Sequence, residues 1–299
     1  MSEIVCAELA PHGTLRAGIN LSNFLLVSGK SRSGEPEGVA PSLARAIADR
    51  LGVPVHYVTF PRPGDLADAV NTNAWDIGLI GAEPQRAEKI TFTAAYAEIE
   101  ATYLVPPGST LSTIAEIDQP GLRIAVAARS AYGLWSERNI RHAELVQSNS
   151  LDASFEQFVR DELDALAGLR PRLLADVQKF PGARILEGKF MSVQQAVGTA
   201  SANKVGAAFL RNFIEEAKSS GLIARLIDQF GMTGRLTVAP AAYASPLPVA
   251  GQVAARSTTD EGTHDLLIPG RSGPPFTHRY SPCYLSWWRG PCSSERLSL

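Results

Sequence analysis

The side chains that most often carry catalysis or bind metals are scattered along this sequence. The five histidines lie far apart, at His12, His56, His142, His264 and His278. The three cysteines lie near the two ends of the chain, at Cys6, Cys283 and Cys292, and such an odd set makes a poor disulfide framework. The patterns GxSxG, GxGxxG and HExxH and the Walker phosphate loop do not occur. We therefore expect no metal, no cofactor and no catalytic centre.

Composition and charge exclude several classes of partner. The 299 residues are 45% hydrophobic and 19% charged, which is typical of a soluble globular protein large enough for two lobes. A formal net charge of −2 gives no electrostatic reason to expect nucleic acid or an acidic membrane. No stretch reaches the roughly 20 apolar residues of a membrane helix, so we expect no membrane insertion.

The compartment is left open by the first residues. Residues 1–14 have neither the basic nor the apolar region of a secretory signal peptide. Either the protein stays in the cytoplasm, or a leader was removed, or the start codon was misassigned.

Short strand patterns alternate with amphipathic helical patterns from residue 14 onward. Residues 15–20, 53–60 and 75–81 are typical of strands, and the last of these is apolar enough for the centre of a parallel sheet. Residues 41–51 place Leu43, Ala44, Ile47 and Leu51 on one helical face. A second predicted helix covers residues 65–70. This order predicts a sheet with helices on both faces.

A second α/β unit follows the Pro-Pro-Gly stretch at residues 106–108. The predicted strands are residues 123–128, 144–148, 163–169, 184–187 and 192–199. The predicted helices are residues 131–140, 152–160, 172–180, 203–218 and 222–230. In the fourth of these helices we expect Val205, Phe209 and Phe213 to form a buried face.

Residues 244–299 have a different composition, rich in Pro, Gly, Ser and Thr and without periodicity. Such a segment buries too little surface to offset its chain entropy, so we expect a mostly disordered tail. Trp287 and Trp288 leave open the alternative of a docking peptide there.

Three segments carry a family pattern. Residues 13–20 read GTLRAGIN, residues 38–58 contain the helix PSLARAIADRLG, and residues 76–109 read DIGLIGAEPQRAEKITFTAAYAEIEATYLVPPGS. Together they resemble the family-three solute-binding proteins, which are substrate-binding domains of ABC transporters with a type-two periplasmic-binding-protein-like fold. The resemblance covers about residues 13–240. It implies an α/β fold of two lobes, each a mixed sheet flanked by helices. Lobe one would comprise residues 1–104 and 198–243, and lobe two residues 105–197.

The resemblance assigns the ligand's carboxylate to Arg86. A planar guanidinium offers two parallel donors to a carboxylate and stays charged when it is desolvated. The alternative is a surface arginine at a helix start. Family members place a Ser or Thr just before this arginine, whereas Glu83 stands in that segment here, so Gly81 and Ala82 would donate from the backbone.

On lobe two the resemblance points to the turn at Arg129 and Ser130, before the helix at residues 131–140. Backbone amides at a helix N-terminus hold anions, and the Ser130 hydroxyl would add a donor; the alternative role of Ser130 is a helix cap. Arg129 replaces the usual glycine of the family, which either adds a positive charge or hinders close backbone approach.

The predicted ligand differs from the ordinary one for this family. Amino-acid receptors of the family place an aspartate, which receives the ligand's ammonium, where this chain has Leu169 and Arg170. A cation facing the cleft would repel an ammonium and attract a second acidic group, so an organic acid is the hypothesis. The alternative is that Arg170 points to solvent.

Several further residues are expected near the ligand. In the loop after the first strand, Asn20 and Asn23 would contribute side-chain amides, and Phe24 would form either a cleft wall or part of the core. On the strand at residues 192–199, either Gln194 or Gln195 should face the cleft, and Gln195 is the one we assign. Tyr132 is a further cleft candidate, while Trp135 is assigned to the core.

The function implied by this resemblance is that of a monomeric receptor that closes its lobes on a small carboxylate and delivers it to an ABC permease. Two alternatives remain. A cyclohexadienyl-dehydratase-like enzyme on the same fold would need a carboxylic acid with a raised pKa between the lobes, for which Glu83, Glu98 and Glu187 are the candidates. A cytoplasmic ligand-sensing module is the other.

Overall fold

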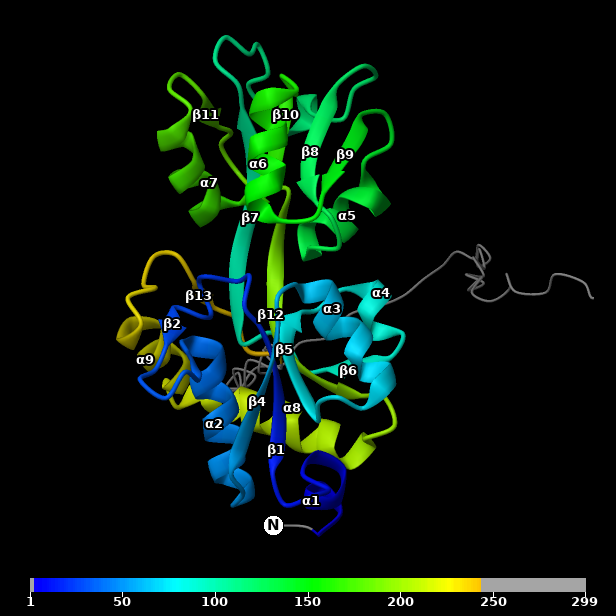
Figure 1. Ribbon diagram of the computed structural model, residues 1–299, viewed down its shortest axis with the longest axis vertical. Helices are drawn as coiled ribbons and strands as arrows, with labels where there is room; N and C mark the ends of the chain where they lie inside the picture. Colours follow the sequence, from blue (N-terminus) through cyan, green and yellow to red (C-terminus); the bar gives the residue numbers. More distant parts are fainter. Residues whose placement is uncertain (1–2, 243–299) are drawn as a thin grey trace, which may run out of the picture. The chain divides into compact units, whose positions relative to one another are not determined.

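The computed structural model describes residues 3–242, and these residues are built on one 11-stranded sheet (Figure 1). Its main path runs in the order β4-β1-β5-β12-β7-β10-β8-β9. The two central strands are β7 (Ala97–Val105) and β12 (Met191–Ala200), and they join two groups of elements, here called lobe one and lobe two. The predicted two-lobed α/β fold is confirmed. The predicted disordered tail, with Trp287 and Trp288, lies outside the described residues.

Lobe one contains both ends of the described chain. Its elements are α1 (Glu3–Leu9), β1 (Leu15–Asn20), β2 (Gly29–Lys30), β3 (Pro36–Glu37), α2 (Val39–Leu51), β4 (Val55–Phe60), α3 (Pro63–Asp68), η1 (Ala69–Thr72), β5 (Ile77–Gly81), α4 (Pro84–Ala87), β6 (Ile90–Phe92), α8 (Lys204–Ser219), α9 (Leu222–Gln229) and β13 (Thr237–Val238). Lobe two consists of η2 (Ile114–Glu116), β8 (Arg123–Ala127), α5 (Ala131–Asn139), β9 (Glu144–Ser148), α6 (Leu151–Arg160), β10 (Ala165–Leu169), α7 (Arg170–Asp176), η3 (Val177–Lys179) and β11 (Arg184–Ile185).

The two central strands change partners along their length. In β7, Ala97 and Glu98 pair with β12 and β13, whereas residues 101–104 pair antiparallel with β10. In β12, residues 195–198 pair with β5 and Met191 pairs with Ala101 of β7. The chain therefore passes between the lobes inside these two strands. The predicted divisions after residues 104 and 197 lie close to these points and stay a prediction.

Burial patterns explain most elements of lobe one. In α2 the predicted face of Leu43, Ala44 and Ile47 is buried, and Gly52 ends the helix in the left-handed conformation at φ 74°. In α8 the predicted face is only partly correct. Phe213 is buried, but Val205 is 40% exposed because the helix turns other residues inward.

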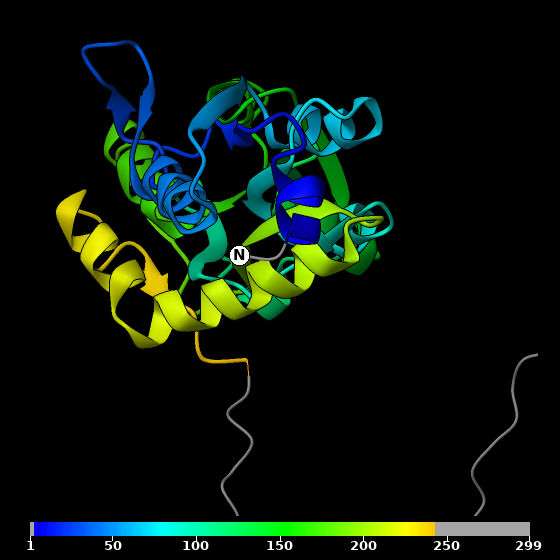
Figure 2. The same ribbon diagram turned by 90° about the horizontal axis from the view of Figure 1, so that it is seen from below.

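The sequence patterns did not predict α1, which contacts α8 (Figures 1 and 2). Glu8 forms the link: its carboxylate accepts a hydrogen bond from the Gly206 amide at 2.6 Å and its carbonyl accepts one from Asn203 at 3.1 Å. A side chain at position 206 would overlap Leu9, so the glycine permits this contact.

A buried ion pair fixes the start of β5, the strand that ends at the candidate site. Asp76 is 4% exposed and receives the Arg16 side chain through two hydrogen bonds, from Nη2 at 2.7 Å and from Nε at 3.1 Å. The Arg16 backbone amide donates to the same carboxylate at 2.8 Å. These bonds hold β1 and β5 in register at the end opposite the cleft.

Gly38 at the start of α2 provides a test of the packing in lobe one. It has φ 144°, and a Cβ there would lie 2.3 Å from the Leu26 carbonyl oxygen and 2.8 Å from the Val27 Cα. Gly38→Ala should therefore lower the free energy of unfolding by about 1–3 kcal/mol, measured by urea denaturation. Gly29→Ala is the matched control, because nothing lies within 4 Å of a Cβ there. Equal stability of the two variants would contradict this packing.

Candidate functional site

Among the cavities lined by described residues of both lobes, two share Arg86. The smaller, here called the small cavity, has a volume of about 50 Å³. Its lining comes from the ends of β1, β5 and β10, the start of α5, and β12; the residues are Asn20, Ser22, Asn23, Pro63, Gly81, Arg86, Ser130, Ala131, Tyr132, Leu151, Leu169, Val193 and Gln195. This set includes five of the predicted polar or charged site residues and draws on both lobes.

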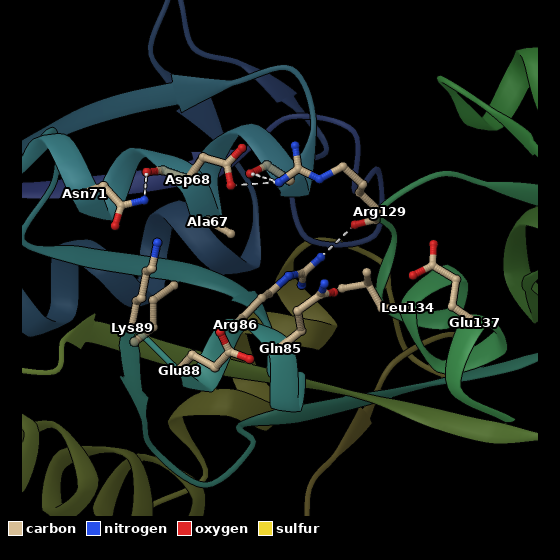
Figure 3. A pocket seen from close by; sticks show the side chains of 12 residues that line it. Ala67, Asp68, Asn71, Gln85, Arg86, Glu88, Lys89, Arg129, Leu134 and Glu137 are labelled. Carbon is tan, nitrogen blue, oxygen red and sulfur yellow. Dashed lines mark hydrogen bonds and ion pairs between the residues drawn. The ribbon is translucent and has the colours of Figure 1, made fainter. Parts of the chain in front are cut away.

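The second space, here called the large cavity, has a volume of about 410 Å³ and is shown in Figure 3. It lies between α3, η1 and α4 of lobe one and α5 of lobe two. Charged side chains of both signs line it, namely Asp68, Glu88 and Glu137 with Arg86, Lys89 and Arg129. Arg86 lines both cavities and therefore lies at their boundary.

Arg86 lies in the short helix α4 directly after β5 and is only 6% exposed. Its Nη1 donates to the Gly81 carbonyl at 2.6 Å, and its Nη2 donates across the lobes to the Arg129 carbonyl at 2.9 Å (Figure 3). Among residues 3–242 its hydrogen-bond acceptors are backbone carbonyls, and no carboxylate pairs with it.

Burial lowers the pKa of Arg86 to about 10, although the nearby Glu83 carboxylate raises it. The side chain is therefore a cation at neutral pH. A buried guanidinium that meets only neutral carbonyls gains the most from an anion, because desolvation strengthens a charge-assisted hydrogen bond.

The two backbone donors predicted beside Arg86 differ in availability. The Ala82 amide donates to the Gln194 carbonyl at 2.7 Å, so it is already used inside the sheet. Gly81 lines the small cavity, and a Cβ there would lie 3.1 Å from Val193 and 3.2 Å from Ala131. Glycine at this position thus permits the close approach of lobe two.

Ser130 is the N-cap of α5 and is 7% exposed. Its hydroxyl donates to the Ala127 carbonyl at 2.8 Å and accepts from the Gly133 amide at 2.9 Å. The capping role is therefore present, and the hydroxyl reaches the small cavity with both of these bonds made. Gly133 is required here, since a Cβ on it would lie 2.6 Å from the Ala127 oxygen.

Arg129 has φ 57°, the left-handed region in which an arginine is uncommon. The side chain does not enter the small cavity. It extends over lobe one, where Nη2 donates to Asp68 at 2.8 Å and to the Gly64 carbonyl at 3.3 Å. The positive charge predicted at this position is thus present, but it is paired and lines the large cavity.

Glu83 and Arg138 form a contact between the lobes that sequence reasoning missed. The Glu83 side chain is 4% exposed, and its carboxylate accepts a hydrogen bond from Arg138 of α5 at 2.5 Å. A glutamate in place of the family's hydroxyl was the available signal, but its partner on α5 could not be read from the chain.

The model of the bacterial extracellular solute-binding proteins, family 3, matches residues 20–233. The chain belongs to this family. No curated protein sequence matches it. Solved structures share the fold at low identity. The substrate-binding protein of an amino acid ABC transporter has a TM-score of 0.60 and 22% identity, over 73% of this chain and 99% of that one.

Two further solved structures share the fold of this solute-binding protein. A mutant of ArgBP from T. maritima has a TM-score of 0.62 and 21% identity, over 76% of this chain and 99% of its own. The ancestral amino acid-binding protein AncCDT-1, a precursor of cyclohexadienyl dehydratase, has a TM-score of 0.61 and 20% identity, over 77% and 99%. The relatives are thus mainly binding proteins. Among the described residues, no helix is long and apolar enough to span a membrane, and no cluster of His, Cys, Asp or Glu could hold a metal.

Arg170, which was expected to face the cleft of this solute-binding protein, does not line the small cavity. Its side chain turns away from the small cavity, where Leu169 lies instead, and Nε donates to Glu100 at 3.1 Å. Nη2 donates to the Gly188 carbonyl. Burial alone would raise the pKa of Glu100, but hydrogen bonds from Lys189 and Arg170 lower it. Arg170 thus belongs to an ion-pair group beside β7.

Of the three residues predicted in the loop after β1, two line the small cavity and one packs on the core. Asn20 and Asn23 both line the small cavity, but each side chain also caps a turn: Asn20 Oδ1 accepts from the Ser22 hydroxyl at 2.8 Å and Asn23 Oδ1 from the Leu25 amide at 3.2 Å. Phe24 does not line either cavity. It packs on the main core, with the Arg235 guanidinium 5.6 Å from its ring centre, which is the core alternative.

Gln195 of β12 lines the small cavity and is 4% exposed. Its side-chain amide makes no hydrogen bond with another residue of the described range. Tyr132, the further candidate, also lines this cavity, and burial raises its pKa. Trp135 is half-buried, and its ring is tilted by 36° against that of Phe190 at 4.9 Å between the ring centres. The apolar members Leu151, Leu169 and Val193 were missed because nothing in their local pattern distinguishes a cavity wall from a core.

The Ser130 cap provides a test of this geometry. Ser130→Ala removes one acceptor and one donor in a buried turn, so it should lower the free energy of unfolding by about 1–2 kcal/mol in urea denaturation. Ser150→Ala is the matched control: Ser150 caps α6 through one bond, to Ala153 at 3.0 Å, and is exposed. A smaller loss at Ser130 than at Ser150 would contradict the buried double bond.

Proposed function

We propose that this protein is the substrate-binding receptor of an ABC-type importer and captures a small carboxylate-bearing ligand by closure of its two lobes. The observation that carries the proposal is Arg86, a buried guanidinium at the boundary of both cavities whose acceptors are only backbone carbonyls. A ligand carboxylate would replace these neutral acceptors with two charge-assisted bonds. The family, and the shared fold with the substrate-binding protein of an amino acid ABC transporter, support the transport role.

The ligand we infer is an organic acid, or an amino-acid-like molecule whose amine is held without a protein carboxylate. The support no longer comes from Arg170. It comes from the lining of the small cavity, which includes no Asp or Glu that could receive an ammonium, whereas Asp68, Glu88 and Glu137 line the large cavity. A cationic amine placed there would lose its hydration without a charged partner, which is unfavourable.

A dehydratase-like activity on this fold is the less favoured function. It would need a carboxylic acid beside the ligand, and none of its three candidates lines either cavity. Glu83 pairs with Arg138, Glu98 lies in the paired part of β7, and Glu187 is exposed. The description of AncCDT-1 as a dehydratase precursor keeps this activity worth an assay.

The mechanism we propose is rotation of lobe two on lobe one about β7 and β12. The lobes would divide after residues 104 and 197, and a bound ligand shifts the equilibrium by its additional contacts in the closed form. The receptor would act as a monomer without a cofactor and deliver its ligand to a permease. The permease and the ligand are the only partners the proposal requires.

A thermal-shift screen followed by calorimetry tests this function. Amino acids, dicarboxylates and aromatic acids are added to the full chain, and a binder raises the melting temperature because it stabilises only the folded state. Arg86→Lys should then weaken binding of the best ligand about 10- to 100-fold, since a lysine lacks the two-donor fork.

Arg50→Lys is the matched control, because Arg50 holds Glu216 through two hydrogen bonds at 3.0 and 2.6 Å within lobe one. Its affinity should equal that of the wild type. Unchanged affinity of Arg86→Lys would exclude Arg86 as the carboxylate ligand. Turnover of prephenate or arogenate by the wild type would replace the receptor function with the dehydratase activity.

A further inference from the structure

Three polar contacts between groups of the protein itself join the lobes directly around Arg86. They are the hydrogen bond from Arg86 to the Arg129 carbonyl, the ion pair of Arg129 with Asp68, and the ion pair of Arg138 with Glu83. In each of them one partner belongs to α3, α4 or the residue before α4, and the other to the turn before α5 or to α5 itself. We call these three contacts the interlobe latch.

Arg129 is the centre of this latch, because both its backbone carbonyl and its guanidinium bind lobe one. Its carbonyl accepts from Arg86, while its guanidinium donates to Asp68 and to the Gly64 carbonyl. The guanidinium also packs closely on α3: a Cβ on Gly64 would lie 2.8 Å from Arg129 Cζ. A left-handed arginine is unfavourable for the backbone, and these contacts offset that cost.

The second ion pair is more buried. Glu83 is 4% exposed and Arg138 37% exposed, whereas Arg129 and Asp68 are 51% and 63% exposed. Salt screens exposed pairs much more than buried ones. The Arg129 pair should therefore respond to ionic strength, and the Glu83 pair should persist.

The small cavity in the latched arrangement is too small for the inferred ligand, whereas the large cavity, which Arg86 also lines, has a volume of about 410 Å³. The small cavity holds about 50 Å³, whereas one water molecule occupies about 30 Å³ in the liquid and ligand sites measure roughly 300–1,000 Å³. Two of the five N–H donors of Arg86, one on each Nη atom, also already bind carbonyls. A carboxylate can reach Arg86 in the small cavity only after the lobes separate and the Arg129 carbonyl leaves.

We propose that Arg129 is an internal competitor for Arg86: with the Glu83–Arg138 pair it holds the ligand-free lobes closed, and a ligand enters the small cavity only by displacing it. Closure without ligand stands on the contacts alone. The competition rests on the proposed receptor function. Arg129 is thereby a specificity-determining residue, since only an anionic group gains enough at Arg86 to replace the contacts that it breaks.

The test of closure uses the full ligand-free chain with two spin labels. Thr72 at the end of η1 and Asn139 at the end of α5 are exposed and lie on opposite lobes beside the latch. They are replaced by cysteine in a chain whose Cys6, Cys283 and Cys292 are replaced by serine, and the distance between the labels is measured by double electron–electron resonance. The labelled protein should give one short distance, consistent with the latched arrangement.

Two variants loosen the latch in different ways. Arg129→Gly removes the guanidinium, and glycine adopts φ 57° without strain, so the turn before α5 is retained. Gly64→Ala leaves every charge in place but forces the Arg129 side chain away from α3. Each, combined with Glu83→Gln, should shift the label distance upward by several ångströms.

Arg50→Ala is the matched control, because the Arg50–Glu216 pair has similar exposure, 45% and 56%, but lies within lobe one. It should leave the distance unchanged. A wild-type distance equal to that of the loosened variants would overturn the latch, and so would loosened variants that stay as short as the wild type.

Ligand affinity provides the second readout. Arg129→Gly should bind the best ligand of the thermal-shift screen more tightly than the wild type, because the competing contacts are weakened. Equal or weaker binding would overturn the competition. A chain that is closed without ligand and binds none of the acids would overturn the receptor function and leave the latch standing, so the two failures are distinguishable.

Discussion

The buried charge of Arg86 is the constraint on which the arrangement of this cleft depends. A guanidinium that is 6% exposed must have its donors satisfied, and the chain supplies the carbonyls of Gly81 and Arg129 from opposite lobes. Glycine at position 81 allows β12 and α5 to approach within contact distance of that turn. Elements of both lobes therefore meet at one buried cation.

The continuous sheet allows this cation to lie between two lobes. β7 and β12 each pair with lobe one at one end and with lobe two at the other, so a change in their twist moves whole groups of strands. The anchoring bonds lie far from these crossings, as the Arg16–Asp76 pair at the start of β5 illustrates. Rigid lobes and two crossing strands are the combination from which hinge closure arises.

Periodicity predicted the elements well because it reflects burial within one element. The strand at residues 15–20 and the helix ending at Leu51 are found with those bounds, since their apolar residues repeat at the expected spacing. Side-chain direction was harder to predict. Phe24 packs on the core and Arg170 turns to Glu100, because each found a partner from a distant segment. The Glu83–Arg138 pair was invisible for the same reason: its members are 55 residues apart and belong to different lobes.

Arg129 illustrates how one substitution changes what a cleft can select. Glycine at this turn would adopt φ 57° freely and keep the carbonyl that Arg86 binds, but it would lack the side-chain bonds to Asp68 and Gly64. Arginine costs backbone energy there, and it persists in the structure with three contacts on the opposite lobe. Those contacts lower the free energy of the ligand-free closed form. A ligand therefore binds only if its own contacts with the protein contribute more free energy than the contacts that it breaks. A neutral or cationic ligand has no interaction with Arg86 strong enough for this, whereas a carboxylate does. Selectivity for anions can thus arise from contacts within the protein that a ligand must replace, as well as from the contacts that the ligand makes.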